Sequence, residues 1–461
     1  MPHQILHRLL PALAALLCLP QLFLEPTTTR AAEPRPNILI ITADNLGYGD
    51  LPCFRPESPI KAPNFDRLAG DGAKLTQFYT PSSTCTVSRA CLLTGRIPQR
   101  HGLQIQLPGI EGNYGTGLRT SEILIPQILK PAGYATGCFG KWNIGFASGS
   151  RPTERGFDEF LGHASGNIDY YSHVYNGKHD LFAGVEEAHR EGYSTDLFAD
   201  AAAGFIRRNA GRPWFCYLPF NAPHFPNTRN KAPGQDNIWQ APEDAFEAYG
   251  YDPETRDPQQ RYHAVVTALD TALGKVLDTL DELKLTDQTF VFFYSDNGAF
   301  MLKDRGLEVS SNAPLRDGGV TCWEGGIRVA AIARWPGHIT PGRVISEALW
   351  SPDLLIASSK LADAALPPGR KLDGLDPLPV LTSDAASPHQ SLYFTYRRHA
   401  ALRRGDWKIV RTNPANDWQL FNLRDDPGET TNLATAQPDQ LARLATEFDR
   451  WTATATAQNS P

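Results

Sequence analysis

Three continuous apolar runs stand out in the pattern of hydrophobic and polar positions along this chain. They are Asn37–Thr42 (NILIIT), Pro213–Phe220 (PWFCYLPF) and Thr289–Ser295 (TFVFFYS). A strand that is covered on both faces shows no polar side, so a continuous apolar run is typical of a buried strand in a largely parallel sheet. The pattern therefore predicts three such strands.

Helical spacing is found between these runs. Before the third run, apolar residues recur every three to four positions, namely Val266, Leu269, Leu273, Val276 and Leu280. Ser121–Lys130 and Ser194–Arg208 are two further helical candidates. Strands that alternate with helices predict an α/β fold class, in which helices flank a large, mostly parallel mixed sheet.

The last part of the chain has a different pattern. After the Pro-rich stretch ALPPGRKLDGLDPLPVL come three segments, SLYFTYR, AALRRGDWKIVRT and WQLFNLRDDPGE, which read as short strands separated by turns with Pro and Gly. They predict a small C-terminal α+β subdomain with an antiparallel sheet. We place the main domain at 33–386 and this subdomain at 387–461.

The first thirty-two residues have the pattern of a secretory signal peptide. Arg8 precedes an apolar run over Leu9–Leu24, and the small residues Ala31 and Ala32 follow. A membrane anchor is the alternative, but the run is short and two prolines interrupt it. We expect residues 1–32 to be removed and the protein to be periplasmic or secreted. No later run is long enough for a stable membrane anchor in the mature chain.

Charge and cysteine content limit the partners. The formal net charge of -6 over 461 residues indicates no nucleic-acid partner, because proteins that bind nucleic acids are usually basic. Six cysteines remain after the signal peptide, and they could form disulfides or stay as buried free thiols. These six are Cys53, Cys85, Cys91, Cys138, Cys216 and Cys322.

Polar residues follow each of the three buried runs directly. Asp44 and Asn45 follow the first, His224 follows the second, and Asp296 and Asn297 follow the third. Ligands of open α/β sheets bind outside the carboxyl ends of the strands, so we expect these residues to converge. A single Asp-Asn pair usually makes a turn or a helix cap. Two pairs after two buried strands favour a site for Ca²⁺ or Mg²⁺, which prefer oxygen ligands.

A cysteine motif, STCTVSRACLLTGR at 83–96, adds possible chemistry to this crevice. Cys85 is open to four interpretations: a buried thiol, half of a disulfide, a thiolate nucleophile, or a residue that is modified further. Arg89 lies one helical turn later on the same face, and Lys141 sits between glycines in FGKWNIG. We expect Cys85 at the N-terminus of a helix beside them. Positive side chains and a divalent cation suit an ester of a tetrahedral oxyanion.

Taken together, these segments resemble the formylglycine-dependent type I sulfatases of the alkaline-phosphatase-like superfamily. The family motif is Cys-x-Pro-Ser-Arg followed by Leu-x-Thr-Gly-Arg. Here it stands as Cys85-Thr86-Val87-Ser88-Arg89 and Leu92-Leu93-Thr94-Gly95-Arg96. The similarity covers essentially the whole mature chain, through PNILIITADNLGYGDL, FGKWNIG, ERGFDEFLG, NAPH, FYSDNGA and FNLRDDPGETTNLA in the expected order.

The resemblance implies an alkaline-phosphatase-like sandwich and a sulfuric ester hydrolase. A maturation enzyme would oxidise Cys85 to formylglycine, a built-in cofactor. One hydroxyl of the hydrated aldehyde attacks sulfur, and the second lets the sulfated hemiacetal collapse, an exit that a thiolate or a serine lacks.

Further site roles are implied by the same resemblance. Arg89 would hold the formylglycine, Lys141 would bind the sulfate, and His224 would stabilise or protonate the leaving oxygen. Ca²⁺, with Mg²⁺ as the second choice, would be bound by five residues, namely Asp44, Asn45, Cys85 in its modified form, Asp296 and Asn297.

Four positions depart from the family pattern. The family usually has Asp at Asn45, Pro at Val87, His at Asn143 and Lys at Gly319. An Asn can still bind a metal through its carbonyl oxygen, with one negative charge less. Val87 lies within the stretch that the maturation enzyme reads, and Asn143 leaves His224 as the only retained histidine. Three residues are candidates to replace the missing cation at Gly319: Lys303, Arg305 and Arg316.

The partner would be a sulfated small molecule or glycan. Export and the aromatic, His-bearing loop HASGNIDYYSHVYNG favour a sulfated carbohydrate. Two other functions remain open on the same scaffold: hydrolysis of phosphate or phosphonate esters, and non-catalytic binding of sulfated glycans with Cys85 unconverted.

Overall fold

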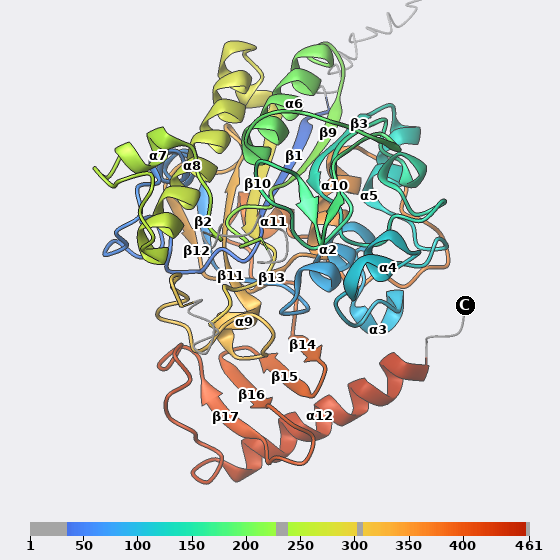
Figure 1. Ribbon diagram of the computed structural model, residues 1–461. Helices are drawn as coiled ribbons and strands as arrows, with labels where there is room; N and C mark the ends of the chain where they lie inside the picture. The colour runs from blue at the N-terminus through green and yellow to red at the C-terminus, as the bar shows by residue number, and fades with distance from the viewer. Residues whose placement is uncertain (1–34, 227–237, 302–307, 458–461) are drawn as a thin grey trace, which may run out of the picture. The chain divides into compact units, whose positions relative to one another are not determined.

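A sheet of eleven strands runs through the part of the chain that the computed structural model describes, which comprises residues 35–226, 238–301 and 308–457 (Figure 1). Its order is β12 (Arg343–Ile345), β2 (Ala73–Tyr79), β11 (Arg328–Arg334), β10 (Thr289–Ser295), β1 (Asn37–Ala43), β9 (Trp214–Pro219), β3 (Ala135–Lys141), β4 (Glu159–His163), β7 (Phe182–Ala183) and β8 (Glu186–Glu187), with β13 (Leu349–Trp350) also paired to β2. Strands β10, β1, β9, β3 and β4 are mutually parallel, and antiparallel pairs flank them on both sides. This confirms the predicted large, mostly parallel mixed sheet.

Both faces of the sheet are covered, which explains why its central strands are continuously apolar. Along β1, Ile38 and Ile40 point into one core and Leu39 and Ile41 into another. The first core includes residues of α2 (Cys85–Thr94), α5 (Ile125–Leu129) and α10 (Asp353–Leu361). The second includes residues of α1 (Pro63–Gly70), α6 (Ser194–Arg208) and α8 (Pro258–Glu282). Figure 1 labels α6 and α8.

The predicted helices are present, and one is shorter than expected. The α6 helix has the predicted bounds, and α8 contains the predicted periodic residues. Within Ser121–Lys130, only α5 is α-helical, and a short 3₁₀ turn, η1 (Lys130–Ala132), follows it. Pro126 explains the late start, since proline lacks the N–H that an interior helical position must donate and is tolerated in the first turn.

Several short elements complete the main part of the chain. They are α3 (Pro98–His101), α4 (Gly109–Tyr114), η2 (Pro152–Arg155), the hairpin of β5 (Val174–Tyr175) and β6 (Lys178–His179), α7 (Glu243–Glu247), η4 (Thr286–Gln288), α9 (Glu324–Ile327) and α11 (Leu378–Thr382).

The C-terminal part forms a separate antiparallel sheet, as predicted. Its strands are β14 (Ser391–Tyr396), β15 (His399–Arg404), β16 (Trp407–Arg411) and β17 (Gln419–Asn422), and α12 (Pro438–Ala457) packs against it. The segment AALRRGDWKIVRT forms two strands rather than one, because the chain turns at Gly405, which has a φ of 57°. The domain boundary at 387 stays a prediction.

Buried charges join this small sheet to the rest of the protein. The Lys408 ammonium on β16 lies 2.9 Å from Glu324 Oε1 and 2.8 Å from Glu429 Oε1, and none of the three side chains is exposed. Glu324 also accepts a hydrogen bond from the hydroxyl of Tyr79 on β2, at 2.7 Å. Glu324 has a second cation, Arg328, at 3.5 Å, so Glu429 is the carboxylate that depends on the Lys408 ammonium most strongly.

We expect Lys408→Met to lower the free energy of unfolding by about 3–5 kcal/mol, because Glu429 would remain buried without its cation and Glu324 would keep only Arg328. Arg404→Ala is the matched control on the neighbouring strand, since Arg404 pairs with Glu447 at 2.7 Å but its side chain is 49% exposed. That change should cost about 1 kcal/mol or less. Urea unfolding of both variants measures the difference, and equal costs would contradict this account.

The cysteines settle one open question. All six that the structure describes are free, and five of them are buried, so the free-thiol alternative holds rather than disulfides.

Among the described residues, no helix is long and apolar enough to cross a membrane. The predicted signal peptide lies outside the described residues.

Candidate active site

The predicted site residues lie together at the carboxyl ends of four adjacent parallel strands. Past β1, the Asp44 N–H donates to Ala222 O, and past β10, the Asp296 N–H donates to Ala43 O, both at 3.0 Å. The main chain therefore continues to pair beyond the strands, which holds the segments that follow them in register. The residues placed at this edge are Asp44 and Asn45 after β1, Asp296 and Asn297 after β10, Lys141 at the end of β3, and His224 after β9.

Two carboxylates and two cations form the buried centre of this site. Lys141 Nζ lies 2.5 Å from Asp44 Oδ2, and an Arg89 guanidinium nitrogen lies 2.7 Å from Asp296 Oδ2. None of the four side chains is exposed. Arg89 also donates to the Lys141 carbonyl at 3.1 Å, which ties α2 to the end of β3. Burial acts to lower the pKa of Arg89, but Asp296, Asp44 and the other acidic groups around it together outweigh burial and raise the pKa, so Arg89 stays charged.

Cys85 is the first residue of α2, as predicted. The Thr84 backbone before it is extended, and Arg89 lies one turn later. Burial raises the pKa of the Cys85 thiol above its usual range; Asp44 and Asp296 add to the effect, and Lys141 and Arg89 oppose it. A reactive thiolate needs a lowered pKa. The thiolate interpretation of Cys85 is therefore disfavoured by its surroundings.

The oxygen atoms of this site fit a hard divalent cation. Ligand atoms of Asp44, Cys85 and Asp296 all lie within 4.8 Å of one another. Asp44 Oδ1 and Asn297 Oδ1 are buried without a hydrogen-bond partner in the described part of the chain. Burial, and then Asp44, raise the pKa of Asp296 to about 6. Crowded carboxylates and unpartnered oxygens are what Ca²⁺ relieves when it binds.

Asn45 belongs to the same oxygen cluster. It adopts a left-handed backbone with a φ of 64°, which Asn tolerates better than most residues. Its N–H donates to Asp296 Oδ1 at 3.2 Å, and its Oδ1 accepts from Asn297 Nδ2 at 2.5 Å. The second lone pair of Oδ1 remains for a metal. The hydrogen bond between the Asn45 and Asn297 amides therefore also fixes the orientation of Asn297 Oδ1.

His224 is neutral in this arrangement. Its Nδ1 lies 2.7 Å from the Phe225 carbonyl, which can only accept, so Nδ1 carries the ring proton and Nε2 a lone pair. Burial, and then the Lys141 charge, lower the pKa of His224 to about 3. A small cavity of about 20 Å³ is lined by His224 together with Asn45 and Phe300. His224 can therefore give a proton only after it has gained one.

A network of amides around Cys85 was missed by the sequence analysis. Gln106 Oε1 accepts from the Thr84 hydroxyl at 2.8 Å, from the Thr86 N–H at 3.3 Å and from the Cys85 thiol at 3.3 Å. Asn143 accepts from the Thr86 hydroxyl at 2.8 Å and donates to Asn113 at 2.6 Å. No motif marks Gln106, because it comes from a loop that follows α3.

The four departures from the family pattern fit their surroundings. Asn45 and Asn143 are hydrogen-bonded as described, and Val87 is buried within α2. At Gly319, an added Cβ would lie 2.8 Å from the Gly298 carbonyl oxygen, so a lysine there would need the backbone to move. Arg316 stacks on Trp323 and donates to the Glu429 carbonyl. The other two candidate cations, Lys303 and Arg305, lie outside the described residues.

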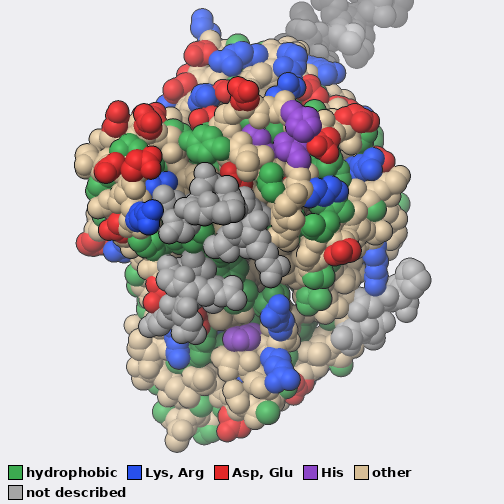
Figure 2. Space-filling view, viewed as in Figure 1, with side chains coloured by type: hydrophobic (Ala, Val, Ile, Leu, Met, Phe, Trp, Pro, Cys, Tyr) green, Lys and Arg blue, Asp and Glu red, His purple; other side chains and the backbone are tan. Residues whose placement is uncertain are grey.

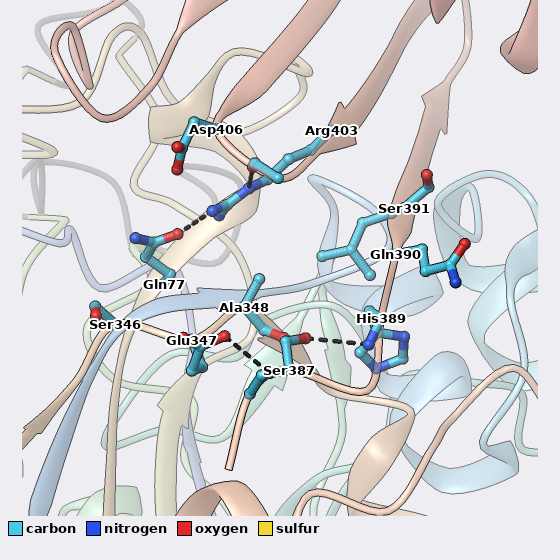
Figure 3. Close-up of a pocket in the computed structure, with 13 residues that line it drawn as sticks. Gln77, Ser346, Glu347, Ala348, Ser387, His389, Gln390, Ser391, Arg403 and Asp406 are labelled. Carbon is cyan, nitrogen blue, oxygen red and sulfur yellow. Dashed lines mark hydrogen bonds between the residues drawn. The ribbon is translucent and has the colours of Figure 1, made fainter. Parts of the chain in front are cut away.

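A pocket elsewhere in the protein shares none of these residues. It has a volume of about 230 Å³ and lies between the C-terminal sheet and the edge of the large sheet, where Figure 3 shows Arg403 turned toward Gln77. Several of its polar groups are already paired: Arg403 with Gln77, and Glu347 with the Ser387 N–H at 2.8 Å.

Comparison with known proteins agrees with this geometry. The Sulfatase family model matches residues 36–363. N-acetylgalactosamine-6-sulfatase of Canis lupus familiaris is 31% identical over 432 residues, covering 89% of this chain and 78% of the relative. Arylsulfatase A of Bos taurus is 33% identical over 487 residues, covering 91% and 89%. The solved structure of Ps i-CgsB in complex with k-i-k-neocarrahexaose is 28% identical with a TM-score of 0.82, covering 92% of this chain and 94% of that one.

The chain belongs to the sulfatase family of the alkaline-phosphatase-like superfamily. It is a sulfuric ester hydrolase.

Proposed function

We propose that this enzyme is exported and hydrolyses the sulfate esters of a carbohydrate, using a formylglycine made from Cys85 and a bound calcium ion. The observation that carries the proposal is the position of Cys85. It begins a buried helix and lies against Lys141, Arg89, Asp44 and Asp296 at the strand ends. A maturation enzyme that oxidises Cys85 is the implied partner.

Each residue of the site has a definite task in this proposal. Asp44, Asn45, Asp296 and Asn297 would hold the calcium ion. When present, the calcium ion polarises the sulfate oxygens and the formylglycine supplies the oxygen nucleophile. Lys141 and Arg89, both buried, hold positive charge where the non-bridging sulfate oxygens gather charge in the transition state. The free N–H groups at the start of α2 add to that potential.

His224 would protonate or stabilise the oxygen of the leaving alcohol. Its Nε2 is free in the neutral ring, since Nδ1 is held by Phe225. An anionic sulfate beside the ring favours the protonated form and so raises the pKa of His224. Bound substrate therefore prepares the proton that the leaving alcohol needs. Asn143 cannot take this role, because an amide does not titrate near neutral pH.

A carbohydrate substrate is supported by two observations. The loop HASGNIDYYSHVYNG lies next to the site, because the Tyr170 hydroxyl donates to the His224 carbonyl at 2.8 Å, while the neighbouring Tyr171 is 44% exposed. Exposed aromatic rings suit contact with the apolar faces of sugars. Several relatives are named for sugar sulfates, and the Ps i-CgsB structure contains a neocarrahexaose.

Parallel assays with an aryl sulfate and an aryl phosphate test the reaction type. We expect the sulfate to be turned over much faster, because the site offers monovalent side-chain cations and a single metal position rather than a paired metal clamp. Faster turnover of the phosphate would favour the phosphate ester alternative. Binding of sulfated glycans without any turnover would favour the non-catalytic alternative.

Removal of metal should abolish turnover. We expect protein treated with EDTA and dialysed to lose aryl sulfatase activity and to recover it with CaCl₂, and less fully with MgCl₂, which tolerates irregular oxygen sites poorly. Metal content is measured on the same samples by mass spectrometry. Full activity in a metal-free sample would contradict the proposed role of Asp44 and Asp296.

Gln106→Ala tests the amide network. We expect kcat/KM to fall about tenfold, because the N-terminal groups of α2 and residue 85 would lose a shared acceptor worth about 1 kcal/mol. Gln104→Ala is the matched control, since Gln104 is exposed two residues earlier. The state of residue 85 is measured in both variants, so that a defect in maturation is separated from a defect in turnover. Equal rates for the two variants would remove Gln106 from the site.

A further inference from the structure

A cluster of histidines and one glutamate lies outside the active site. His179 ends β6, Glu187 ends β8, and His189 follows two residues later. Their ligand atoms all lie within 4.8 Å of one another. Figure 2 shows histidine side chains gathered at one place on the surface that it draws. None of the three belongs to the strand-end site, and the proposed reaction does not use them.

The main chain fixes the positions of these residues. His179 pairs with Val174 in the β5–β6 hairpin, and the Asp180 N–H donates to the His173 carbonyl at 2.8 Å. Glu187 pairs with Phe182 between β7 and β8, and the next residue, Ala188, donates to the Leu181 carbonyl at 2.8 Å. Side chains carried by paired strands are held more firmly than those of an isolated loop. The cluster is therefore built into two short hairpins.

The spacing of the side chains suits a tetrahedral ion. His189 Nε2 lies 3.4 Å from Glu187 Oε1. Two ligands of a tetrahedral Zn²⁺ at about 2.0–2.1 Å from the metal are about 3.3 Å apart. The rings of His179 and His189 are stacked with centroids 4.4 Å apart, so the second imidazole is already beside this pair. Small side-chain rotations would close the remaining distance.

His179 is also oriented as a ligand. Its Nε2 lies 3.0 Å from the Ala188 carbonyl, which can only accept, so Nε2 carries the proton and Nδ1 keeps a lone pair. A histidine that binds a metal commonly donates its other N–H to a backbone carbonyl in this way, which fixes the tautomer.

A fourth imidazole lies deeper behind the cluster. His173 is 1% exposed, and its ring centroid lies 6.4 Å from that of His179. Its Nε2 is buried without a hydrogen-bond partner among the described residues. The His173 ring also has backbone hydrogen bonds to Gly192 and Tyr170, so it is held in place as a wall behind the cluster.

We propose that His179, Glu187 and His189 form a second metal site, which binds Zn²⁺, with His173 as the buried imidazole behind it. Two imidazoles and one carboxylate are a donor set of zinc rather than of calcium, which prefers oxygen ligands alone. Bound zinc would link the β5–β6 hairpin to the β7–β8 hairpin.

The test measures zinc binding by the full-length protein, purified without a histidine tag and titrated with ZnCl₂ in excess CaCl₂. All samples carry Cys85→Ala, so that zinc does not bind the thiol of the active site. We expect His179→Ala and His189→Ala each to weaken the binding of one zinc ion at least tenfold. Loss of a residue that only hydrogen-bonds to a zinc ligand already costs about tenfold or more in affinity, and loss of a ligand itself should cost no less. His338→Ala is the matched control, because His338 is an exposed histidine stacked on Trp335.

His189 is 76% exposed, so its replacement leaves the fold intact, and circular dichroism checks this. Zinc binding that is equally strong in His189→Ala and in His338→Ala would overturn the proposal, as would the absence of zinc binding in the parent protein. Since activity is not the readout, either result is independent of the proposed sulfatase mechanism.

Discussion

Cys85→Ala is expected to abolish sulfate ester hydrolysis, with a loss of about a thousandfold or more in kcat. The variant should fold normally and keep its metal, since Cys85 is 3% exposed and the change removes only one sulfur atom from the start of α2. In the proposed mechanism turnover depends on this residue, because it alone would supply the nucleophile, whereas Lys141, Arg89 and the metal would only stabilise charge. Initial rates with an aryl sulfate measure the loss.

Two further variants complete this experiment. Cys85→Ser would accept a sulfate but lacks the exit by elimination, so we expect a single slow turnover at most. Cys53→Ala is the matched control, because Cys53 is a partly exposed free thiol outside the site, and its activity should equal that of the parent. A Cys85→Ala variant that hydrolyses the ester at the parent rate would exclude residue 85 as the nucleophile.

Lys141→Ala is expected to lower kcat/KM by about a hundredfold to a thousandfold, or about 3–4 kcal/mol, which is typical for the loss of one preorganised donor to a developing charge. Lys141 is fully buried and lies 2.5 Å from Asp44, so no solvent screens its charge. The effect should appear mainly in kcat, because the charge on the sulfate oxygens increases in the transition state.

Lys130→Ala is the matched control for this change. Lys130 pairs with Asp158 at 2.6 Å, but its side chain is 53% exposed, so its removal should leave the kinetics unchanged. Separate values of kcat and KM are needed, together with calcium affinity, because Asp44 also loses its partner in Lys141→Ala. A variant whose kcat stays within a factor of about two of the parent would contradict the assigned role.

The central fold could be predicted from sequence because burial on both faces leaves a strong local signal. The runs at Asn37–Thr42 and Thr289–Ser295 form β1 and β10, and the polar residues that follow them lie close together at the strand ends. This placement follows from parallel pairing alone, since parallel strands end at the same edge. Asp44, Lys141, Asp296 and His224 were therefore predictable as neighbours, although they lie far apart in the chain.

What the sequence could not predict depends on tertiary contacts or on single turns. Gln106 reaches Cys85 from a loop without any motif, so no local pattern reveals it. The neutral form of His224 follows from burial and from its bond to Phe225, neither of which is visible in NAPH. The division of AALRRGDWKIVRT into β15 and β16 depends on the turn at Gly405, which periodicity alone does not detect. The histidines of the proposed zinc site lie at the end of one hairpin and just after another, and no local pattern in the sequence shows that these two places are neighbours.

The mass of the peptide that carries residue 85 tests the central claim most directly. Trypsin should release residues 75–89 from the enzyme purified from its native host, because it cleaves the chain after Lys74 and after Arg89. We predict the mass of an aldehyde in place of the cysteine side chain, with a further mass shift after reaction with a hydrazide. An active enzyme whose peptide carries only the unmodified Cys85 thiol would contradict the account.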